Sequence, residues 1–516
     1  MIEPHHFDPT ILREYDIRGV FGETLHEADA HAIGRCFGAL ICNLERGGPE
    51  RTSGCTPGRP VVAVGRDGRL SSPALERALV AGLAQGGVDV IRIGLAATPM
   101  LYFAEASTPE VQGGIQVTGS HNPRDHNGFK LVLGGAPFFG PDIAGLGEMA
   151  ARGRGTAPTR SDAPLEGAGN LRAIDATLDQ TIGPVGVEDL GIVGDVGTAE
   201  DRDVLPAYVA RLLDGLAGID ADHLAALRIG WDAGNGAAGP ALELLTSQLP
   251  GEHHLLFSEV DGRFPNHHPD PTIEANLADL RALVAAKNLD FGVAFDGDGD
   301  RIGVIDGRGR VIDADQLLMI HARDVLARRP GATVIADVKA SRAVFETVRA
   351  LGGRAEMAPS GHSHIKSRMK ETGALLGGET SGHFFFADDW FGFDDGLYAA
   401  VRLIAASARL GIGVTALRDA MLPMHNTPEL RFAVAESRKF AVIEEVRACL
   451  LASGAQVNTL DGVRVDTADG WWLLRASNTQ AALTARAESD GAEGLERLVA
   501  QIDAQLAASG VSRTGS

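Results

Sequence analysis

Three stretches of the chain pass through the same order of apolar and polar positions. Each begins with a short β-branched apolar run, continues through a polar or glycine turn into an amphipathic helical pattern, and returns after a glycine to a second apolar run. They occupy residues 60–94, 227–258 and 332–361. The pattern predicts three βαβ units. Because the runs are too apolar for a half-solvated sheet, we expect mixed or parallel sheets covered by helices.

Changes in composition divide the chain further. Residues 151–189 are rich in Gly, Ala, Ser, Thr and Pro and show little hydrophobic period, which is typical of a linker. Two prolines interrupt a helical pattern near residue 424, and the following region predicts strands around a polar loop. We therefore expect an α/β protein with three related α/β domains containing mixed sheets and a smaller C-terminal α+β domain. The expected domains are residues 1–165, 166–310, 311–424 and 425–516.

Composition and charge narrow the class of protein. With 65 glycines, 44% hydrophobic and 5% aromatic residues, the 516-residue chain fits an α/β protein. A formal charge of −21 disfavours nucleic acid and anionic membranes as partners, so a small anionic substrate would need a local cationic pocket. The four cysteines show no CxxC spacing, and no uncharged apolar run reaches the roughly 18 residues of a spanning helix. We expect a cytoplasmic protein without a membrane segment.

The run Gly119-Ser120-His121-Asn122-Pro123 places one hydroxyl on a tight polar loop directly after a strand-like segment. Ser120 is therefore a candidate covalent carrier of a transferred group. The alternative is a turn serine that bonds its own backbone. Serine hydrolase chemistry is disfavoured, because Asn122 stands where the GxSxG motif requires glycine.

Three aspartates, Asp296, Asp298 and Asp300, alternate in a loop after the strand-like run LDFGVAF. Such carboxylates suit a hard divalent cation such as Mg²⁺ beside a phosphate. An EF-hand is excluded, since Arg301 and Gly307 occupy the positions of its glycine and its bidentate glutamate. A solvated acidic turn remains the alternative. Together with Ser120, this loop predicts phosphoryl transfer through serine.

A competing motif runs from Gly234 to Gly239, a GxGxxG after a strand, with Glu259 about 20 residues later as in dinucleotide sites. It would predict a dinucleotide-binding oxidoreductase. However, Asp232 and Asn235 place polar side chains where a pyrophosphate requires a close approach of the protein backbone. A second mononucleotide-binding half is also not evident in the sequence. We favour a structural tight turn at these glycines.

Two further polar loops carry candidate binding residues. In GGETSGH, the side chains of Glu379, Ser381 and His383 alternate, so an extended loop would point them one way toward sugar hydroxyls. A glycine-rich surface turn is the alternative. The RASNT loop combines a guanidinium, two hydroxyls and an amide, which suits phosphate oxygens, with Lys339 and His362 as candidate helpers; its polar residues are Arg475, Ser477, Asn478 and Thr479.

The order of these motifs resembles the α-D-phosphohexomutase superfamily over nearly the whole chain. The matching motifs are YDIRG at residues 15–19, TGSHNP with Lys130, DGDGDR, GGETSGH and RASNT. YDIRG and TGSHNP resemble the phosphomannomutase/phosphoglucomutase branch, whereas phosphoglucosamine mutases usually carry an alanine before the serine. The resemblance implies four domains around a central cleft, with a mobile C-terminal domain.

The resemblance also implies roles for the matched residues. Ser120 would carry the phosphate, and Mg²⁺ would be held by a phosphoserine oxygen and the three aspartates. Around that phosphate it places Arg18, His121, Lys130 and Arg301. The sugar would meet Glu379, Ser381 and His383, with Tyr15 of YDIRG among the substrate-binding residues, and the substrate's own phosphate would meet Arg475, Ser477, Asn478 and Thr479.

The implied reaction interconverts hexose 1-phosphate and 6-phosphate, with mannose, glucose or both as the sugar, in a monomer or homodimer. A hexose 1,6-bisphosphate would be intermediate and activator, and either Lys130 or His383 would act as general base. Two departures from the family are a longer stretch at 151–200 and Thr380, where a bulkier residue is expected. A phosphoglucosamine mutase and a non-enzymatic sugar-phosphate sensor remain alternatives.

Overall fold

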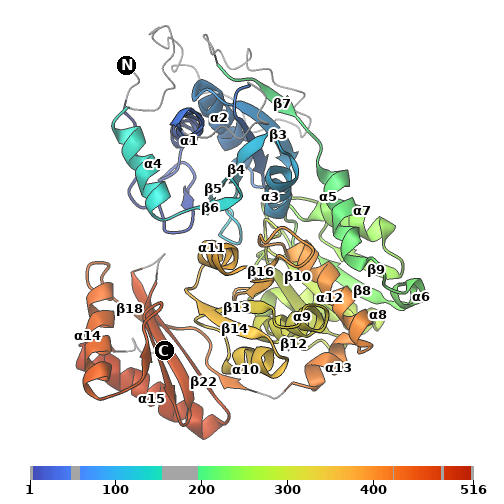
Figure 1. The fold of residues 1–516 in the computed structure, drawn as a ribbon, viewed down its shortest axis with the longest axis vertical. Helices are drawn as coiled ribbons and strands as arrows, with labels where there is room; N and C mark the ends of the chain where they lie inside the picture. The colour runs from blue at the N-terminus through green and yellow to red at the C-terminus, as the bar shows by residue number, and fades with distance from the viewer. Residues whose placement is uncertain (1–3, 48–57, 154–195, 422–423, 478–480, 513–516) are drawn as a thin grey trace. The chain divides into compact units, whose positions relative to one another are not determined.

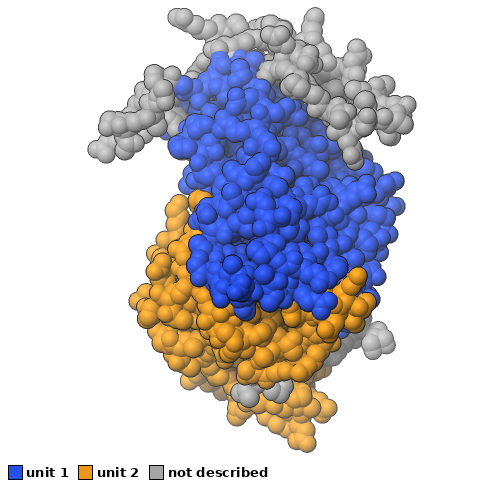
Figure 2. All heavy atoms as spheres, turned by 90° about the vertical axis from the view of Figure 1, so that its right-hand side faces the viewer, with its two compact units in different colours: residues 1–283, 292–302, 395–401 blue, residues 284–291, 303–394, 402–516 orange. Residues whose placement is uncertain are grey.

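The computed structural model describes residues 4–47, 58–153, 196–421, 424–477 and 481–512 (Figure 1). The chain divides into two compact units (Figure 2). The first unit contains residues 1–283, 292–302 and 395–401, and the second contains residues 284–291, 303–394 and 402–516. Four sheets are present in the described residues.

The first sheet is mixed and has the order β1-β5-β4-β2-β3-β7, with β6 paired to β5. Strands β3 and β4 both run parallel to β2, whereas β5 runs antiparallel to β4 and to β1. Helix α1 packs on α2, which in turn covers β2 and β3. The elements of this region are β1 (Ile17–Val20), α1 (Glu27–Gly47), β2 (Val61–Arg66), α2 (Ser72–Gln85), β3 (Asp89–Leu95), α3 (Thr98–Ser107), β4 (Val111–Val117), β5 (His126–Leu133), β6 (Ala136–Phe138), α4 (Pro141–Ala151) and β7 (Ala199–Asp201).

The second sheet has the order β12-β11-β10-β8-β9. Its central strand β10 is buried along its whole length, as its apolar sequence FGVAF predicts. The elements are α5 (Leu205–Leu213), a 3-10 helix (Asp214–Leu216), α6 (Ala221–Ala226), β8 (Arg228–Asp232), α7 (Gly239–Gln248), β9 (Glu252–Leu256), a 3-10 helix (Glu274–Leu277), α8 (Ala278–Lys287), β10 (Phe291–Phe295), β11 (Ile302–Asp306) and β12 (Val311–Ile312).

The third sheet has the order β14-β13-β15-β16 and is also mixed, because only β16 runs antiparallel to its neighbour. Its elements are α9 (Ala314–Arg328), β13 (Thr333–Asp337), α10 (Arg342–Ala350), β14 (Arg354–Ala358), α11 (His362–Thr372), β15 (Leu376–Gly378), β16 (Phe384–Phe386), α12 (Gly396–Leu410) and α13 (Val414–Asp419).

The fourth sheet is antiparallel, with the order β17-β22-β21-β20-β19 and with β18 also paired to β22. Trp472 and Leu474 belong to the core shared with helices α14 and α15, whereas Trp471 and Leu473 pack with Val338, directly after β13. Both faces of β21 are therefore buried, which explains its continuous apolar run. The elements are β17 (His425–Asn426), β18 (Leu430–Ala433), α14 (Lys439–Ala452), β19 (Val457–Asn458), β20 (Val463–Thr467), β21 (Gly470–Ala476), β22 (Ala482–Ser489) and α15 (Ala492–Ala508).

The three expected βαβ units are confirmed. They are β2-α2-β3, β8-α7-β9 and β13-α10-β14, and the two strands of each unit run parallel. The mixed sheets and the α+β character of the C-terminal domain are confirmed as well. The four domain ranges and the central cleft stay predictions. Most of the predicted linker at 151–189 lies outside the described residues. Within the described part, no helix is long and apolar enough to cross a membrane.

A buried histidine lies in the core under β16. His321 on α9 is 1% exposed, and its ring makes edge contacts with Phe384 and Phe386 at centroid distances of 5.3 and 5.0 Å. Neither ring nitrogen has a hydrogen-bond partner within the described residues. Burial, followed by the charge of Arg402, lowers the pKa of His321 to about 3, with Asp324 acting in the opposite direction. The imidazole is therefore neutral in the folded protein at neutral pH.

This histidine should make the protein less stable as the pH falls. The unfolded chain binds a proton at His321 below about pH 6.5 and the folded chain does not, so stability is lost between about pH 6.5 and 3. Between pH 7 and 5 the loss is about 2 kcal/mol. We expect His321→Leu to reduce the decrease in thermal unfolding midpoint between these pH values, while His425→Gln on the exposed strand β17 follows the wild type. An unchanged pH dependence in His321→Leu would contradict this account.

Candidate active site

Ser120 lies in the loop between β4 and β5 in the first unit. It is 1% exposed and has a φ of 48°, a conformation that is uncommon outside glycine and that proteins retain chiefly at functional sites. Its Oγ donates a hydrogen bond to Asp296 Oδ2 at 2.9 Å and lies 3.2 Å from Nδ1 of His121. The hydroxyl is thus fixed at the edge of the acidic loop.

The acidic loop between β10 and β11 buries all three of its carboxylates. Asp296, Asp298 and Asp300 each offer an oxygen atom, and these atoms lie within 4.8 Å of one another. Lys130 on β5 donates to Asp298 Oδ2 at 2.8 Å and also binds Asp300, and Thr98 donates to Asp298 Oδ2 at 2.6 Å. The other oxygen of Asp298, Oδ1, is buried and has no hydrogen-bond partner in the part of the chain that the structure describes. A cluster of carboxylate oxygens that includes this buried acceptor fits a hard metal cation.

The carboxyl groups of this cluster differ in acidity. Burial, followed by the negative charges of Asp298 and Asp300, raises the pKa of Asp296 well above its ordinary value. Burial and Asp300 act in the same direction at Asp298, but Lys130 and the Thr98 hydroxyl outweigh them and lower its pKa. A cation bound to the cluster would favour the ionised form of every carboxyl.

Two of the predicted arginines also belong to this site. Arg18 on β1 lies opposite Gly128 of β5, donates to the Asn122 side chain at 2.9 Å and is paired with Asp16. The backbone N–H of Arg301 donates to Asp296 Oδ1 at 3.1 Å, and its guanidinium Nε lies 4.0 Å from the same carboxylate. Tyr15 is half-buried and lies two residues before the start of β1. The first unit thus brings most of the predicted phosphate-handling residues together around one loop pair.

The GxGxxG motif forms a turn that supports the acidic loop. A Cβ at Gly236 would lie 2.9 Å from the carbonyl oxygen of Gly297 and 3.1 Å from that of Asp296. The next residue, Ala237, donates its N–H to the Gly297 carbonyl at 2.9 Å. Glycine is therefore required for the close approach of two loops, which is the structural interpretation that the sequence favoured.

The sugar-loop candidates lie together in the second unit. The chain turns tightly after β15, where the N–H of Glu379 donates to the His383 carbonyl at 3.0 Å. Nδ1 of His383 lies 2.9 Å from Ser381 Oγ and 3.3 Å from Glu379 Oε2. Burial acts to raise the pKa of Glu379, but His383 and Lys339 outweigh it and lower that pKa. A buried carboxylate beside an imidazole and a hydroxyl can receive hydrogen bonds from a polyol.

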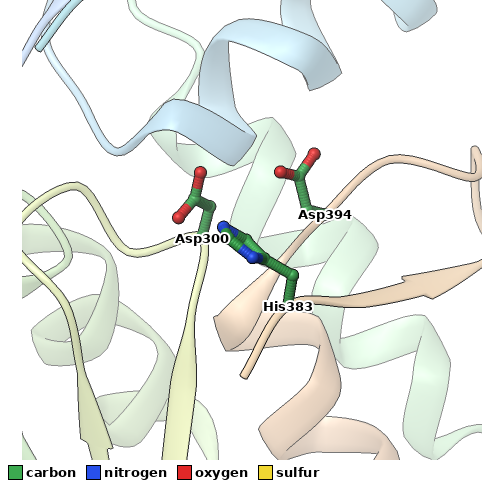
Figure 3. A group of neighbouring side chains, drawn as sticks. All are labelled: Asp300, His383 and Asp394. Atoms are coloured by element: carbon green, nitrogen blue, oxygen red, sulfur yellow. The ribbon is translucent and has the colours of Figure 1, made fainter. Parts of the chain in front are cut away.

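Asp394 joins this cluster and was missed from the sequence. Its Oδ1 accepts a hydrogen bond from Lys366 at 2.7 Å, and its Oδ2 lies 3.5 Å from Nδ1 of His362. The rings of His362 and His383 are 5.6 Å apart. Figure 3 draws His383 and Asp394, together with Asp300 of the first unit. The run DDWFGFDD at residues 388–395 could have indicated Asp394 as a candidate, since binding residues are often found on loops.

The C-terminal loop is described only in part. Arg475 at the end of β21 is 8% exposed, and its Nε lies 3.0 Å from the Asp461 carboxylate. The Ser477 carbonyl accepts a hydrogen bond from Lys439 at 2.7 Å. Asn478 and Thr479 lie outside the described residues. Lys339 follows β13, with its Nζ 3.6 Å from Asp337.

Comparison with protein families covers most of the chain. The models of alpha/beta/alpha domains I, II and III of phosphoglucomutase/phosphomannomutase match residues 9–153, 206–309 and 313–424, respectively. The model of the C-terminal domain of that family matches residues 429–505.

Individual relatives are similar over nearly their full length. The phosphomannomutase/phosphoglucomutase of Pseudomonas aeruginosa is 41% identical over 499 residues, covering 97% of this chain and 96% of the relative. The phosphoglucomutase of Neisseria gonorrhoeae is 40% identical over 496 residues, covering 95% of each. The crystal structure of a phosphoglucomutase/phosphomannomutase family protein from Burkholderia thailandensis aligns with a TM-score of 0.80 and 38% identity, covering 98% of both chains. The chain therefore belongs to the phosphoglucomutase/phosphomannomutase family of phosphohexomutases.

Proposed function

We propose that this protein interconverts hexose 1-phosphate and hexose 6-phosphate through a phosphoserine at Ser120, with mannose and glucose both serving as the sugar. One observation carries the proposal: the Ser120 hydroxyl is held 2.9 Å from Asp296 in a buried cluster of carboxylates that Lys130 bridges. A hydroxyl beside a cation-binding cluster can carry a dianionic phosphoryl group, because the cation offsets its charge.

The chemical step moves one phosphoryl group between two oxygens. The bond between phosphorus and Ser120 Oγ breaks, a bond forms from phosphorus to the sugar hydroxyl, and a base takes the hydroxyl proton. Asp296, Asp298 and Asp300 would hold Mg²⁺, which would supply positive charge to the transferring group. Arg18, His121, Lys130 and Arg301 surround the phosphate, and Lys130 or His383 serves as base and then as acid.

The hexose 1,6-bisphosphate formed in this step turns end for end and returns its other phosphate to Ser120. Either end of the sugar must be accepted, so Glu379 and Ser381 contact hydroxyls that are presented in both orientations. Arg475 and Ser477, with Asn478 and Thr479, bind the phosphate that does not react, and Lys339 and His362 assist them. This recognition does not depend strongly on the configuration at C2, where mannose and glucose differ.

The absence of CxxC pairs among the four cysteines supports a reducing cytoplasm as the location of this reaction.

Removal of the Ser120 hydroxyl should abolish the reaction. Wild-type protein incubated with glucose 1,6-bisphosphate should gain the mass of one PO₃ group, and Ser120→Ala should gain none. We expect kcat of Ser120→Ala to fall by at least about 10³-fold, since no other group can replace the nucleophile. Intact mass spectrometry and a coupled mutase assay measure these effects. Ser107→Ala, at an exposed position at the end of α3, is the control and should keep both properties. Undiminished turnover by Ser120→Ala would refute the proposal.

Removal of the metal ion should abolish activity, as removal of the Ser120 hydroxyl does. Activity should be lost after dialysis against a chelator and should return with added Mg²⁺. Asp298→Asn should raise the Mg²⁺ concentration required for half-maximal activity by about tenfold or more, because it removes a charged ligand. Asp279→Asn, on the exposed surface of α8, is the matched control and should titrate with Mg²⁺ as the wild type does. Full activity in metal-free buffer would exclude the assigned role of the acidic loop.

Truncation of Arg475 should weaken substrate binding in the same way for both sugars. Arg475→Met removes a charged hydrogen-bond donor, so KM for glucose 1-phosphate and for mannose 1-phosphate should each rise about 10- to 100-fold. Arg497→Met, whose side chain is exposed and paired with Asp469, should leave both KM values unchanged.

The same assay tests the breadth of sugar recognition. A several-hundredfold preference of the wild type for one epimer would reject the dual specificity. Faster turnover of glucosamine 6-phosphate than of either hexose phosphate would favour a phosphoglucosamine mutase instead.

A further inference from the structure

Arg69 uses its whole guanidinium group to hold the serine loop. The residue lies between β2 and α2 and is 1% exposed. Its Nη1 donates to the carbonyls of Pro123 at 2.5 Å and His126 at 3.0 Å, and its Nη2 donates to the carbonyls of Ser120 and Asn122, both at 2.7 Å. Its Nε donates to Asp67 at 3.1 Å.

A guanidinium carries five N–H donors, so these five bonds use all of them. Four of the five acceptors are backbone carbonyls of the serine loop and of the first residue of β5, and one of these belongs to Ser120 itself. No donor is left for a phosphate oxygen. The influence of Arg69 on the reaction must therefore pass through the conformation of the loop rather than through contact with the substrate.

Asp67 fixes the backbone on the N-terminal side of Ser120. One of its oxygens accepts from the Thr118 hydroxyl at 2.9 Å and from the Gly119 N–H at 3.1 Å. The Thr118 hydroxyl oxygen in turn accepts from the N–H of Ser120 at 2.8 Å. Both polar groups of the Ser120 backbone are therefore held by buried side chains, which maintains its unusual positive φ.

The space around this peptide leaves little freedom for movement. A Cβ at Gly119 would lie 2.5 Å from Cζ of Arg69, and a Cβ at Gly297 would lie 2.5 Å from the Ser120 carbonyl oxygen. That oxygen thus lies between the Arg69 guanidinium and the backbone of the acidic loop. Loss of the guanidinium would release the peptide at the point where the two loops meet.

We propose that Arg69 is a positioning residue for the phosphoryl transfer, supported by Asp67 and Thr118. It holds the Ser120 side chain next to the carboxylates of the acidic loop, so that these carboxylates lie beside the phosphoryl group that Ser120 carries. The proposal rests on the function proposed above, in which Ser120 carries the phosphate. Displacement of a reacting group by about 1 Å can cost about 10²-fold in rate.

Arg69→Lys is the sharpest test, because it keeps a positive charge while reducing five donors on three nitrogens to three donors on one. The variant should become phosphorylated at Ser120 by glucose 1,6-bisphosphate. Its kcat per phosphorylated molecule should nevertheless fall about 10- to 100-fold, with KM for the hexose phosphate within about threefold of the wild type. Normalising to phosphorylated protein separates positioning from a simple loss of folded enzyme. Arg92→Lys is the matched control, since Arg92 pairs with Glu76 in the same domain, and it should keep the wild-type kcat.

Thr118→Val provides a second variant, should Arg69→Lys fail to fold. It keeps the size of the side chain and removes the hydroxyl between Asp67 and the Ser120 N–H, so it should lower kcat per phosphorylated molecule without changing KM. Wild-type kcat in a phosphorylated Arg69→Lys or Thr118→Val would overturn the positioning role and leave the proposed function intact. No phosphate on wild-type Ser120 would instead refute the proposed function itself.

Discussion

The burial of three carboxylates within reach of one serine hydroxyl is the constraint on which the first unit depends. Like charges at such distances repel strongly once water is excluded. Lys130 and Thr98 offset part of this repulsion at Asp298, whereas at Asp296 burial, followed by the charges of Asp298 and Asp300, raises the pKa. A cation bound to the three carboxylates would offset the remaining repulsion. Gly236 of the supporting turn follows from the same constraint, because a Cβ at this position would collide with the backbone of the acidic loop.

The two units contribute different kinds of chemistry. In the first unit, cationic and acidic side chains gather around Ser120, an arrangement that suits a transferring phosphoryl group. In the second unit, Glu379, Ser381 and His383 form a hydrogen-bonding cluster whose carboxylate has a lowered pKa. An ionised Glu379 is an acceptor only, so it can bind hydroxyls of a sugar without regard to which carbon carries them.

Much of the fold and part of the site could be predicted from local sequence. The βαβ units were evident because buried parallel strands and amphipathic helices leave distinct hydrophobic periods. Ser120 and the aspartates could be singled out because they lie on polar loops directly after apolar strand-like runs. Arg69 and Asp67 escaped notice, since their partners are backbone carbonyls and N–H groups about 50 residues away, which leave no mark in the sequence. Asp394 does stand in a distinctive run, DDWFGFDD, but its partners Lys366 and His362 belong to a separate helix, so its role in the cluster could not be predicted.

The rigidity of the serine loop bears on which partner moves during the reaction. The Ser120 N–H is bound to Thr118, its carbonyl to Arg69, and its hydroxyl to Asp296. The two backbone hydrogen bonds persist when the hydroxyl carries a phosphoryl group, and they oppose a swing of the serine between the two ends of a bound sugar. In a reaction that uses one serine for both ends, the bisphosphate must therefore be the part that turns. Recognition of the sugar then has to be weak enough to release it for this rotation, while the phosphate contacts stay strong enough to keep it from diffusing away.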